Sequence, residues 1–188
     1  MNKSKVIRLC ATTVIIAMLI AAPVLNVSAQ TNVQTPEAVA AQYIEATRAN
    51  DWAKCAQFLH PDALAKMKRM FAPLVVADKT KNFSVDFFGV QNIAEYEKLP
   101  DAVVYERLMS NLVKRVPAYK EAAATSEMQI LGHVKEGTDI VHVVYRMNMK
   151  INGAPVSKMT VMSLKSDGKT WRALLTGDFE AMFTGLSE

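Results

Sequence analysis

Residues 127–176 read EMQILGHVKEGTDIVHVVYRMNMKINGAPVSKMTVMSLKSDGKTWRALLT, and apolar and polar side chains alternate along most of this stretch. Such alternation is typical of strands with one buried face, because successive strand side chains point to opposite faces of a sheet. The dipeptides Glu136-Gly137, Asn152-Gly153 and Asp167-Gly168 interrupt the pattern, and each favours a two-residue hairpin turn. The stretch therefore predicts a meander of four antiparallel strands.

Each turn also predicts the register of the two strands that it joins. Around the first turn Ile130 faces Val143, and around the second Val143 faces Met162. Around the third turn Leu164 faces Trp171. All three registers place one apolar set on the same face, and a slip by one residue would break this agreement. The set comprises Met128, Ile130, Val141, Val143, Tyr145, Met147, Met162, Leu164, Trp171, Ala173 and Leu175.

The opposite face of the meander is predicted to be mostly polar and to carry His133 and His142. It also carries Val144, Val161 and Leu174 in one row across the strands. A contiguous apolar row on an exposed face indicates a contact surface. We therefore expect a homodimer that uses this row on both subunits.

The residues before the meander favour helices. Thr35-Pro36-Glu37 has the cap, proline and acidic residue of a helix start, which predicts a helix over 36–49. Further helices are predicted over 52–59 after Asp51, over 63–71 with Asp62 as cap and Pro73 as terminator, and over 101–116. The aromatic and β-branched run 83–90 predicts a strand. The chain is therefore predicted to be α+β, with helices packed on the sheet.

This order of elements resembles the nuclear transport factor 2-like (cystatin-like) superfamily of cone-shaped domains. The text Tyr43-Ile44-Glu45-Ala46, Asn50-Asp51-Trp52 and Phe58-Leu59-His60-Pro61-Asp62 is similar to its opening pair of helices. The resemblance implies a curved sheet that wraps around helices and leaves an apolar pocket, and an outer sheet face that often forms dimers. Its members include binding modules and enzymes of isomerase, dehydratase and cyclase type.

From the register and the resemblance together, we expect Tyr43, Phe87, Tyr145, Met162 and Trp171 to line a pocket. Isomerase-like members use a carboxylate base and a tyrosine hydroxyl in that pocket, and the nearest candidates here are Asp86 and Tyr145. No sequence motif connects this pair. A core role for Tyr145 and a surface role for Asp86 are the alternatives.

Methionines and a cysteine are the other soft or reactive side chains. Met147, Met149, Met159 and Met162 divide between both predicted faces, which favours flexible packing around an apolar pocket over a copper(I) site. Cys55 follows Trp52 at helical spacing, which indicates a small core residue. No His, Cys and Asp residues have the spacing of a zinc site, so we expect neither a metal nor another cofactor.

The first residues have the features of a cleavable secretory signal peptide. Basic residues precede an apolar run from Leu9 to Ala22, and Val27-Ser28-Ala29 is a small-x-small cleavage site. We expect a signal peptide over 1–29, a short disordered segment over 30–34, one domain over 35–183 and a tail over 184–188. The mature protein would then be periplasmic or secreted, without a stable membrane span.

Removal of this segment would change the charge of the chain. All 18 acidic residues but only 19 of the 22 basic ones follow position 29, so the net charge would fall from +4 to +1. A near-neutral domain does not favour nucleic acid as a partner. The sequence thus predicts an exported protein with a non-catalytic binding or interaction role toward a small apolar ligand. A cofactor-free isomerase, dehydratase or cyclase is the alternative.

Overall fold

The alternating stretch forms a four-stranded antiparallel sheet in the order β1-β2-β3-β4. The strands are β1 (Glu127–Glu136), β2 (Ile140–Ile151), β3 (Ala154–Ser166) and β4 (Trp171–Ala173). The structure is a computed structural model that describes residues 34–175 and 177. The predicted signal peptide, residues 30–33 and the predicted tail lie outside the described residues.

The predicted register of β2 and β3 is confirmed. Val141 pairs with Leu164, Val143 with Met162, and Val144 with Val161. At the turn, Asn152 and Gly153 have φ angles of 52° and 77°. Positive φ at both central residues is what a type I′ hairpin turn requires, and it matches the twist of the two strands.

The predicted register of β1 and β2 is wrong. Glu136 pairs with Ile140, so the loop between them is longer than two residues, and the register shifts again between Ile130 and Gly132. At this irregularity Gly132 has a φ of 153°, which a residue with a Cβ rarely adopts. Ile130 therefore faces Tyr145, and His133 faces Val143 on the helix-covered side of the sheet, not on the outer side as predicted.

The predicted register of β3 and β4 is wrong by two residues. Leu164 faces Ala173, and Trp171 faces Ser166. The reason is a wider turn, in which the Asp167 carboxylate accepts hydrogen bonds from the backbone N–H groups of Lys169 and Thr170, both at 2.9 Å. A shift of two preserves the face, so Ala173 is buried and Trp171 packs partly buried against the core.

Six α-helices and one π-helical turn precede the sheet in the described residues. They are α1 (Pro36–Arg48), α2 (Trp52–Phe58), α3 (Pro61–Ala77), η1 (Ser84–Phe88), α4 (Ile93–Lys98), α5 (Asp101–Arg115) and α6 (Pro117–Thr125). The predicted caps of the first two are confirmed: Thr35 accepts from the N–H of Ala38, and Asp51 accepts from that of Lys54. Helices α4 and α6 were not predicted.

Two predictions about α3 are wrong. His60, not Asp62, caps the helix, since its Nδ1 accepts from the N–H of Asp62 at 3.2 Å. Pro73 lies inside the helix, which continues to Ala77. Phe71 and Val75 on either side of Pro73 are both 1 % exposed, and this burial offsets the backbone hydrogen bond that proline cannot donate.

The predicted strand 83–90 is also wrong, because this segment contains the π-helical turn η1. The aromatic residues that suggested a strand pack on other helices instead. The ring of Phe88 lies 5.9 Å from that of Phe71 and 5.0 Å from that of Tyr96, while Phe83 lies 5.1 Å from Phe87. Aromatic enrichment reflects burial in either kind of element, so it does not separate a strand from a helical turn.

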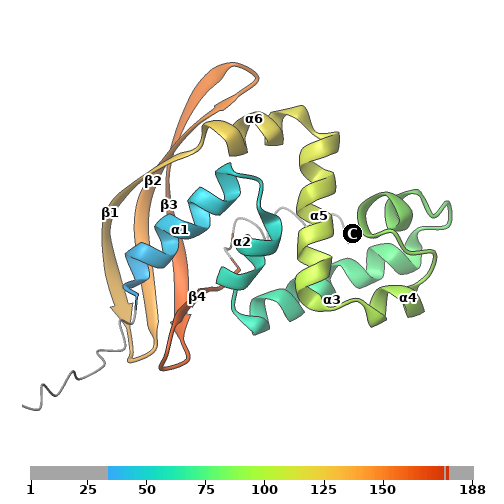
Figure 1. Ribbon diagram of the computed structural model, residues 1–188, viewed down its shortest axis with the longest axis horizontal. Helices are drawn as coiled ribbons and strands as arrows, with labels where there is room; N and C mark the ends of the chain where they lie inside the picture. The colour runs from blue at the N-terminus through green and yellow to red at the C-terminus, as the bar shows by residue number, and fades with distance from the viewer. Residues whose placement is uncertain (1–33, 176, 178–188) are drawn as a thin grey trace, which may run out of the picture. The chain divides into compact units, whose positions relative to one another are not determined.

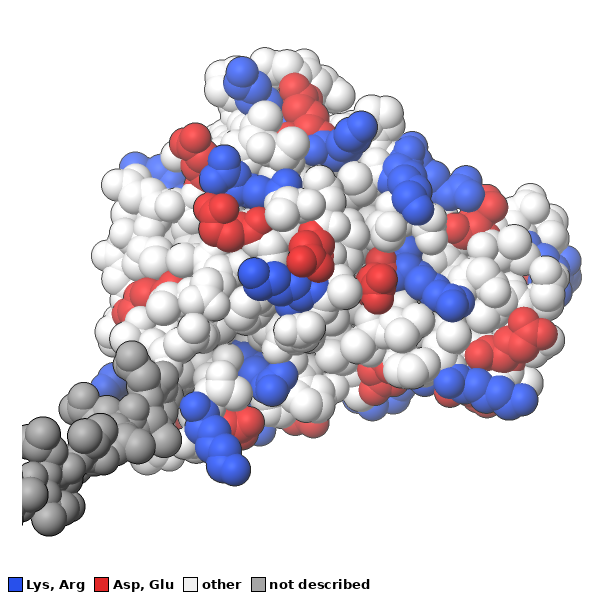
Figure 2. All heavy atoms as spheres, viewed as in Figure 1, with Lys and Arg blue, Asp and Glu red and all other residues white. Residues whose placement is uncertain are grey.

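The helices lie on one side of the sheet. Figure 1 shows α1 running across the strands and α5 standing farther from them. The core fills the space between these layers and includes Val39, Met67, Val104, Leu108, Val143 and Leu164, each at most 2 % exposed. On the face drawn in Figure 2, basic and acidic side chains are interspersed rather than gathered by sign.

Candidate functional site

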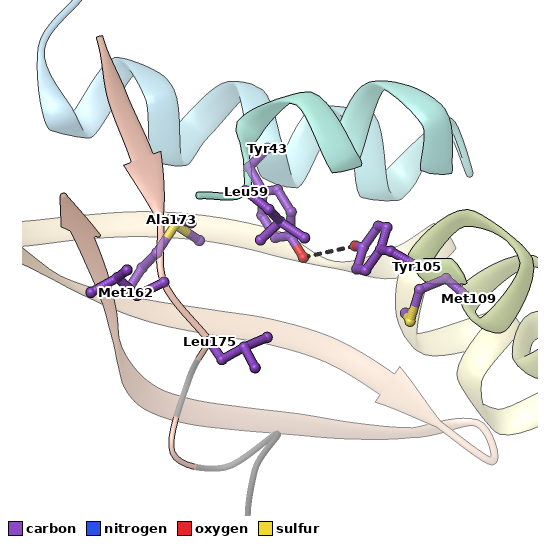
Figure 3. A pocket seen from close by; sticks show the side chains of 8 residues that line it. Tyr43, Leu59, Tyr105, Met109, Met162, Ala173 and Leu175 are labelled. Carbon is purple, nitrogen blue, oxygen red and sulfur yellow. Dashed lines mark hydrogen bonds between the residues drawn. The ribbon is translucent and has the colours of Figure 1, made fainter. Parts of the chain in front are cut away.

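A cavity of about 80 Å³ lies where α1 and α5 meet the strands β3 and β4. Eight residues from five parts of the chain line it, and Figure 3 shows their side chains. They are Tyr43, Leu59, Tyr105, Met109, Met162, Ala173, Leu174 and Leu175. None of these side chains carries a charge, and the only polar ones are the two tyrosines.

The two tyrosine hydroxyls point toward each other across the cavity wall, as Figure 3 shows. Their oxygen atoms are 3.1 Å apart, a distance at which one hydroxyl donates a hydrogen bond to the other. Tyr43 is placed by α1 and Tyr105 by α5, so the bond joins two helices that are far apart in the sequence. One of the two phenol protons is used in this bond.

Burial keeps both phenols neutral. Desolvation raises the pKa of Tyr43 to about 12, although the hydrogen bond with Tyr105 acts in the opposite direction. Desolvation also raises the pKa of Tyr105 well above its usual value, and the neighbouring Tyr43 and Cys55 add to this effect. A neutral phenol in an apolar surrounding is a hydrogen-bond donor for an oxygen acceptor.

Cys55 is a neighbour of Tyr105 and is fully buried, as the sequence predicted. Its Sγ is 3.6 Å from the Oγ1 of Thr47. Desolvation raises the pKa of this thiol. Because the thiolate is the nucleophilic form, a buried thiol with a raised pKa is a packing group rather than a reactive one.

A second cavity, of about 190 Å³, lies between α1, α5, α6 and β2. Its lining is almost entirely apolar. It comprises Ile44, Thr47, Trp52, Met109, Val113, Tyr119, Ala122, Ala123, Ser126, Met147 and Met149. Met109 lines both cavities.

Of the predicted pocket residues, Tyr43 and Met162 line the first cavity. Tyr145 is 5 % exposed on the helix-facing side of β2, and Trp171 stands at the start of β4. Phe87 packs on Phe83 at η1 instead. Neither Tyr145, Trp171 nor Phe87 belongs to the linings of the two cavities described above.

The candidate catalytic pair is not brought together. Asp86 lies in the π-helical turn, and its carboxylate forms an ion pair with Arg115 at 2.8 Å. Both side chains are more than 40 % exposed. Tyr145, in contrast, is buried on β2. The structure thus gives the surface role to Asp86 and the core position to Tyr145, which the sequence left as alternatives.

Sequence reasoning missed Tyr105 and Met109, the α5 residues of the cavity. The sequence predicts an apolar stripe of Val104, Leu108, Leu112 and Val116 on this helix, and Tyr105 stands beside it. A signal was present, because Tyr105, Leu108 and Leu112 follow the i, i+3, i+7 spacing of one helix face. Met109 lies one turn beyond Tyr105 on the same face.

The histidines serve structural contacts. His133 Nδ1 contacts the carboxylate of Glu37 in α1, and His142 bonds Ser163 at 2.9 Å and Glu136 at 2.6 Å on the outer face. Within residues 34–175 and 177, no group of three or more His, Cys, Asp or Glu side chains is arranged to hold a metal ion. No helix in that range has the length and apolar character needed to cross a membrane.

The outer face of the sheet carries part of the predicted row. Val144 and Val161 face each other, as expected. Leu174 instead lies beside Ser163, to whose carbonyl it donates at 2.8 Å, and it lines the first cavity. Val134, Met159 and Val161 are 61 %, 65 % and 43 % exposed, so apolar side chains do gather on this face.

Comparison of the chain with protein-family models, with curated proteins and with solved structures finds no match.

Proposed function

We propose that this protein binds a small, neutral and mostly apolar molecule, and that the Tyr43–Tyr105 pair holds one hydrogen-bond acceptor of that molecule. The observation that carries the proposal is a pair of neutral phenols, with oxygens 3.1 Å apart, in the wall of an otherwise apolar cavity. Buried polar groups in a ligand pocket fix the orientation of the ligand, while the apolar lining supplies most of the affinity.

The chemistry of the lining supports a neutral ligand. A carboxylate or an ammonium group in this cavity would lose its hydration without gaining an opposite charge, which is unfavourable by several kcal/mol. A ketone, ester or hydroxyl oxygen would instead accept a hydrogen bond from the phenol O–H that the Tyr43–Tyr105 bond does not use. The small volume of the cavity and its uncharged lining together favour a compact ketone or alcohol.

The residues that line the first cavity favour a binding role over catalysis. An isomerase or dehydratase needs a carboxylate or an imidazole within hydrogen-bond reach of the reacting carbon. The eight residues that line the first cavity include no Asp, Glu or His.

We also propose that the protein is exported, as its N-terminal residues indicate. We propose further that its helices and meander belong to the nuclear transport factor 2-like superfamily, which the order of elements supports.

The test uses protein labelled with ¹³C at the methionine methyl groups and 2-butanone as the ligand. Because Met109 and Met162 line the first cavity, their methyl signals should shift in a saturable manner. The double variant Tyr43→Phe/Tyr105→Phe should weaken binding about 10-fold, since it removes both hydroxyls that can donate to the ligand. Tyr96→Phe is the matched control, because its hydroxyl bonds the carbonyl of Lys68 outside this cavity. Equal affinity of wild type and the double variant would contradict the proposal.

A further inference from the structure

We propose that the two cavities are halves of one elongated binding site, that the Met109 side chain divides them, and that the full ligand is an unbranched chain ending in a neutral oxygen acceptor. This inference rests on the proposed function, because it places the acceptor at the Tyr43–Tyr105 pair. It adds the second cavity as the place of the alkyl tail.

The two cavities follow the same two helices. On α1, Tyr43 lines the first cavity, and Thr47, one turn later, lines the second. On α5, Tyr105 lines the first, Met109 both, and Val113 the second. These α5 residues are spaced by four, so each step advances by about 6 Å, slightly more than one turn of an α-helix. Along α5 the second cavity therefore begins about one turn beyond the first, whereas on α1 it begins at Ile44, directly after Tyr43.

On the sheet the two linings are also displaced along a strand. Met162 in the first cavity pairs with Val143 on β2. Met147 and Met149 in the second cavity lie four and six residues farther along β2 than Val143. Four residues of an antiparallel strand span about 14 Å. The strand and α5 thus support an arrangement of the cavities end to end, and on α1 the two linings adjoin at Tyr43 and Ile44.

Met109 is suited to be a movable partition. It belongs to both linings and is only partly buried. Methionine is unbranched and has several rotatable bonds, so it changes conformation at low cost in irregular apolar spaces. Figure 3 shows its side chain beside Tyr105 at the edge of the first cavity. A β-branched residue here would be far stiffer.

The second cavity is suited to an alkyl chain. Of the three hydroxyl groups in its lining, that of Thr47 donates to the carbonyl of Tyr43 at 2.9 Å and that of Ser126 to the carbonyl of Ala123 at 2.8 Å; the third belongs to Tyr119. No side chain in its lining is charged. An alkyl tail without polar groups would therefore not disrupt the hydrogen bonds of the Thr47 and Ser126 hydroxyls.

The volumes favour a longer ligand for the joined site than for either cavity alone. The cavities of about 80 and 190 Å³ are each smaller than the ~300 Å³ at which ligand pockets usually begin. Joined, they approach that size. A ketone of about eight carbons, twice the length of 2-butanone, therefore tests the joined site.

The experiment compares 2-butanone with 2-octanone on the methionine-labelled protein. 2-Butanone should shift Met109 and Met162 alone, whereas 2-octanone should also shift Met147 and Met149. The longer ketone should bind up to about 250-fold more tightly, because its four additional methylenes each contribute about a factor of four when fully buried. Ala123→Leu, which fills the second cavity, should abolish this gain and leave 2-butanone binding unchanged. Ala124→Leu, at an exposed position of α6 outside both linings, is the matched control and should leave this gain intact.

The set of methionine signals that shift separates failure of the joined site from failure of the proposed function. If 2-butanone binds as expected but 2-octanone binds no more tightly and leaves Met147 and Met149 unshifted, the joined site is refuted while the proposed function stands. If 2-octanone shifts Met147 and Met149 without Met162, the second cavity acts alone, and the joined site is equally refuted. If neither ketone shifts Met162, the proposed function itself fails.

Discussion

At the scale of single residues, the tyrosine pair is the least expected feature of the core. Two hydroxyl groups in an apolar interior would be unfavourable if they lacked partners, and their mutual hydrogen bond removes part of that cost. The same burial raises the pKa of both phenols, so the pair resists ionisation.

The raised pKa of Tyr43 predicts a loss of stability at high pH. An unfolded tyrosine ionises near pH 10, whereas folded Tyr43 retains its proton until about pH 12. Between these values the folded state binds the additional proton, so the free energy of unfolding falls by up to about 1.4 kcal/mol per pH unit for this group. The contribution is constant below pH 10.

Urea unfolding at pH 9, 10 and 11 measures this dependence. Tyr43→Phe should show a shallower loss above pH 10 than the wild type. Because Tyr105 is also shifted upward, the variant should retain part of the slope. An identical pH dependence in wild type and Tyr43→Phe would mean that Tyr43 is solvated in the folded protein.

At the scale of elements, the β2–β3 hairpin sets which side chains face the helices. Leu164 is fully buried on the inner face, whereas Val161, three residues earlier, is 43 % exposed on the outer face. Leu164→Ala should therefore lower the free energy of unfolding by about 2–5 kcal/mol.

Val161→Ala is the matched control for Leu164→Ala and should cost less than about 1 kcal/mol, because its side chain leaves no enclosed void. Denaturant titration of both variants measures the difference. Equal losses would show that the sheet does not present the two residues to opposite environments.

At the scale of the whole molecule, the outer sheet face lacks helices in the described residues, and Val134, Val144, Met159 and Val161 give it an apolar character. We propose a homodimer through this face. In a two-fold symmetric dimer, Val161→Lys would place one charge from each subunit in the interface, where both would be buried without a partner. Analytical ultracentrifugation at micromolar concentration should show a dimeric wild type and a monomeric variant. A monomeric wild type would refute the proposal.

The N-terminal segment predicts processing of the chain during export. Cleavage after Ala29 would give a mature protein that begins at Gln30. Intact-mass measurement of the protein recovered outside the cytoplasm tests this directly. Recovery of only the uncleaved chain, in the membrane fraction, would contradict it.

The sequence by itself determined the features that depend on neighbouring residues. Alternation of side chains predicted the meander, Asn152-Gly153 set the β2–β3 register, and the caps Thr35 and Asp51 located two helix starts. Each of these signals acts over a few residues, where the backbone preferences of turns and caps outweigh more distant contacts.

Only the tertiary structure decided what depends on distant contacts. Phe83, Phe87 and Phe88 form a helical turn rather than a strand because rings from α3 and α4 pack on this segment. The bulge near Gly132 turned His133 inward, and the meeting of α1 with α5 joined Tyr43 to Tyr105 across 62 positions. Local propensities are of the order of 1 kcal/mol, so burial of large side chains, at about 2–3 kcal/mol each, overrides them.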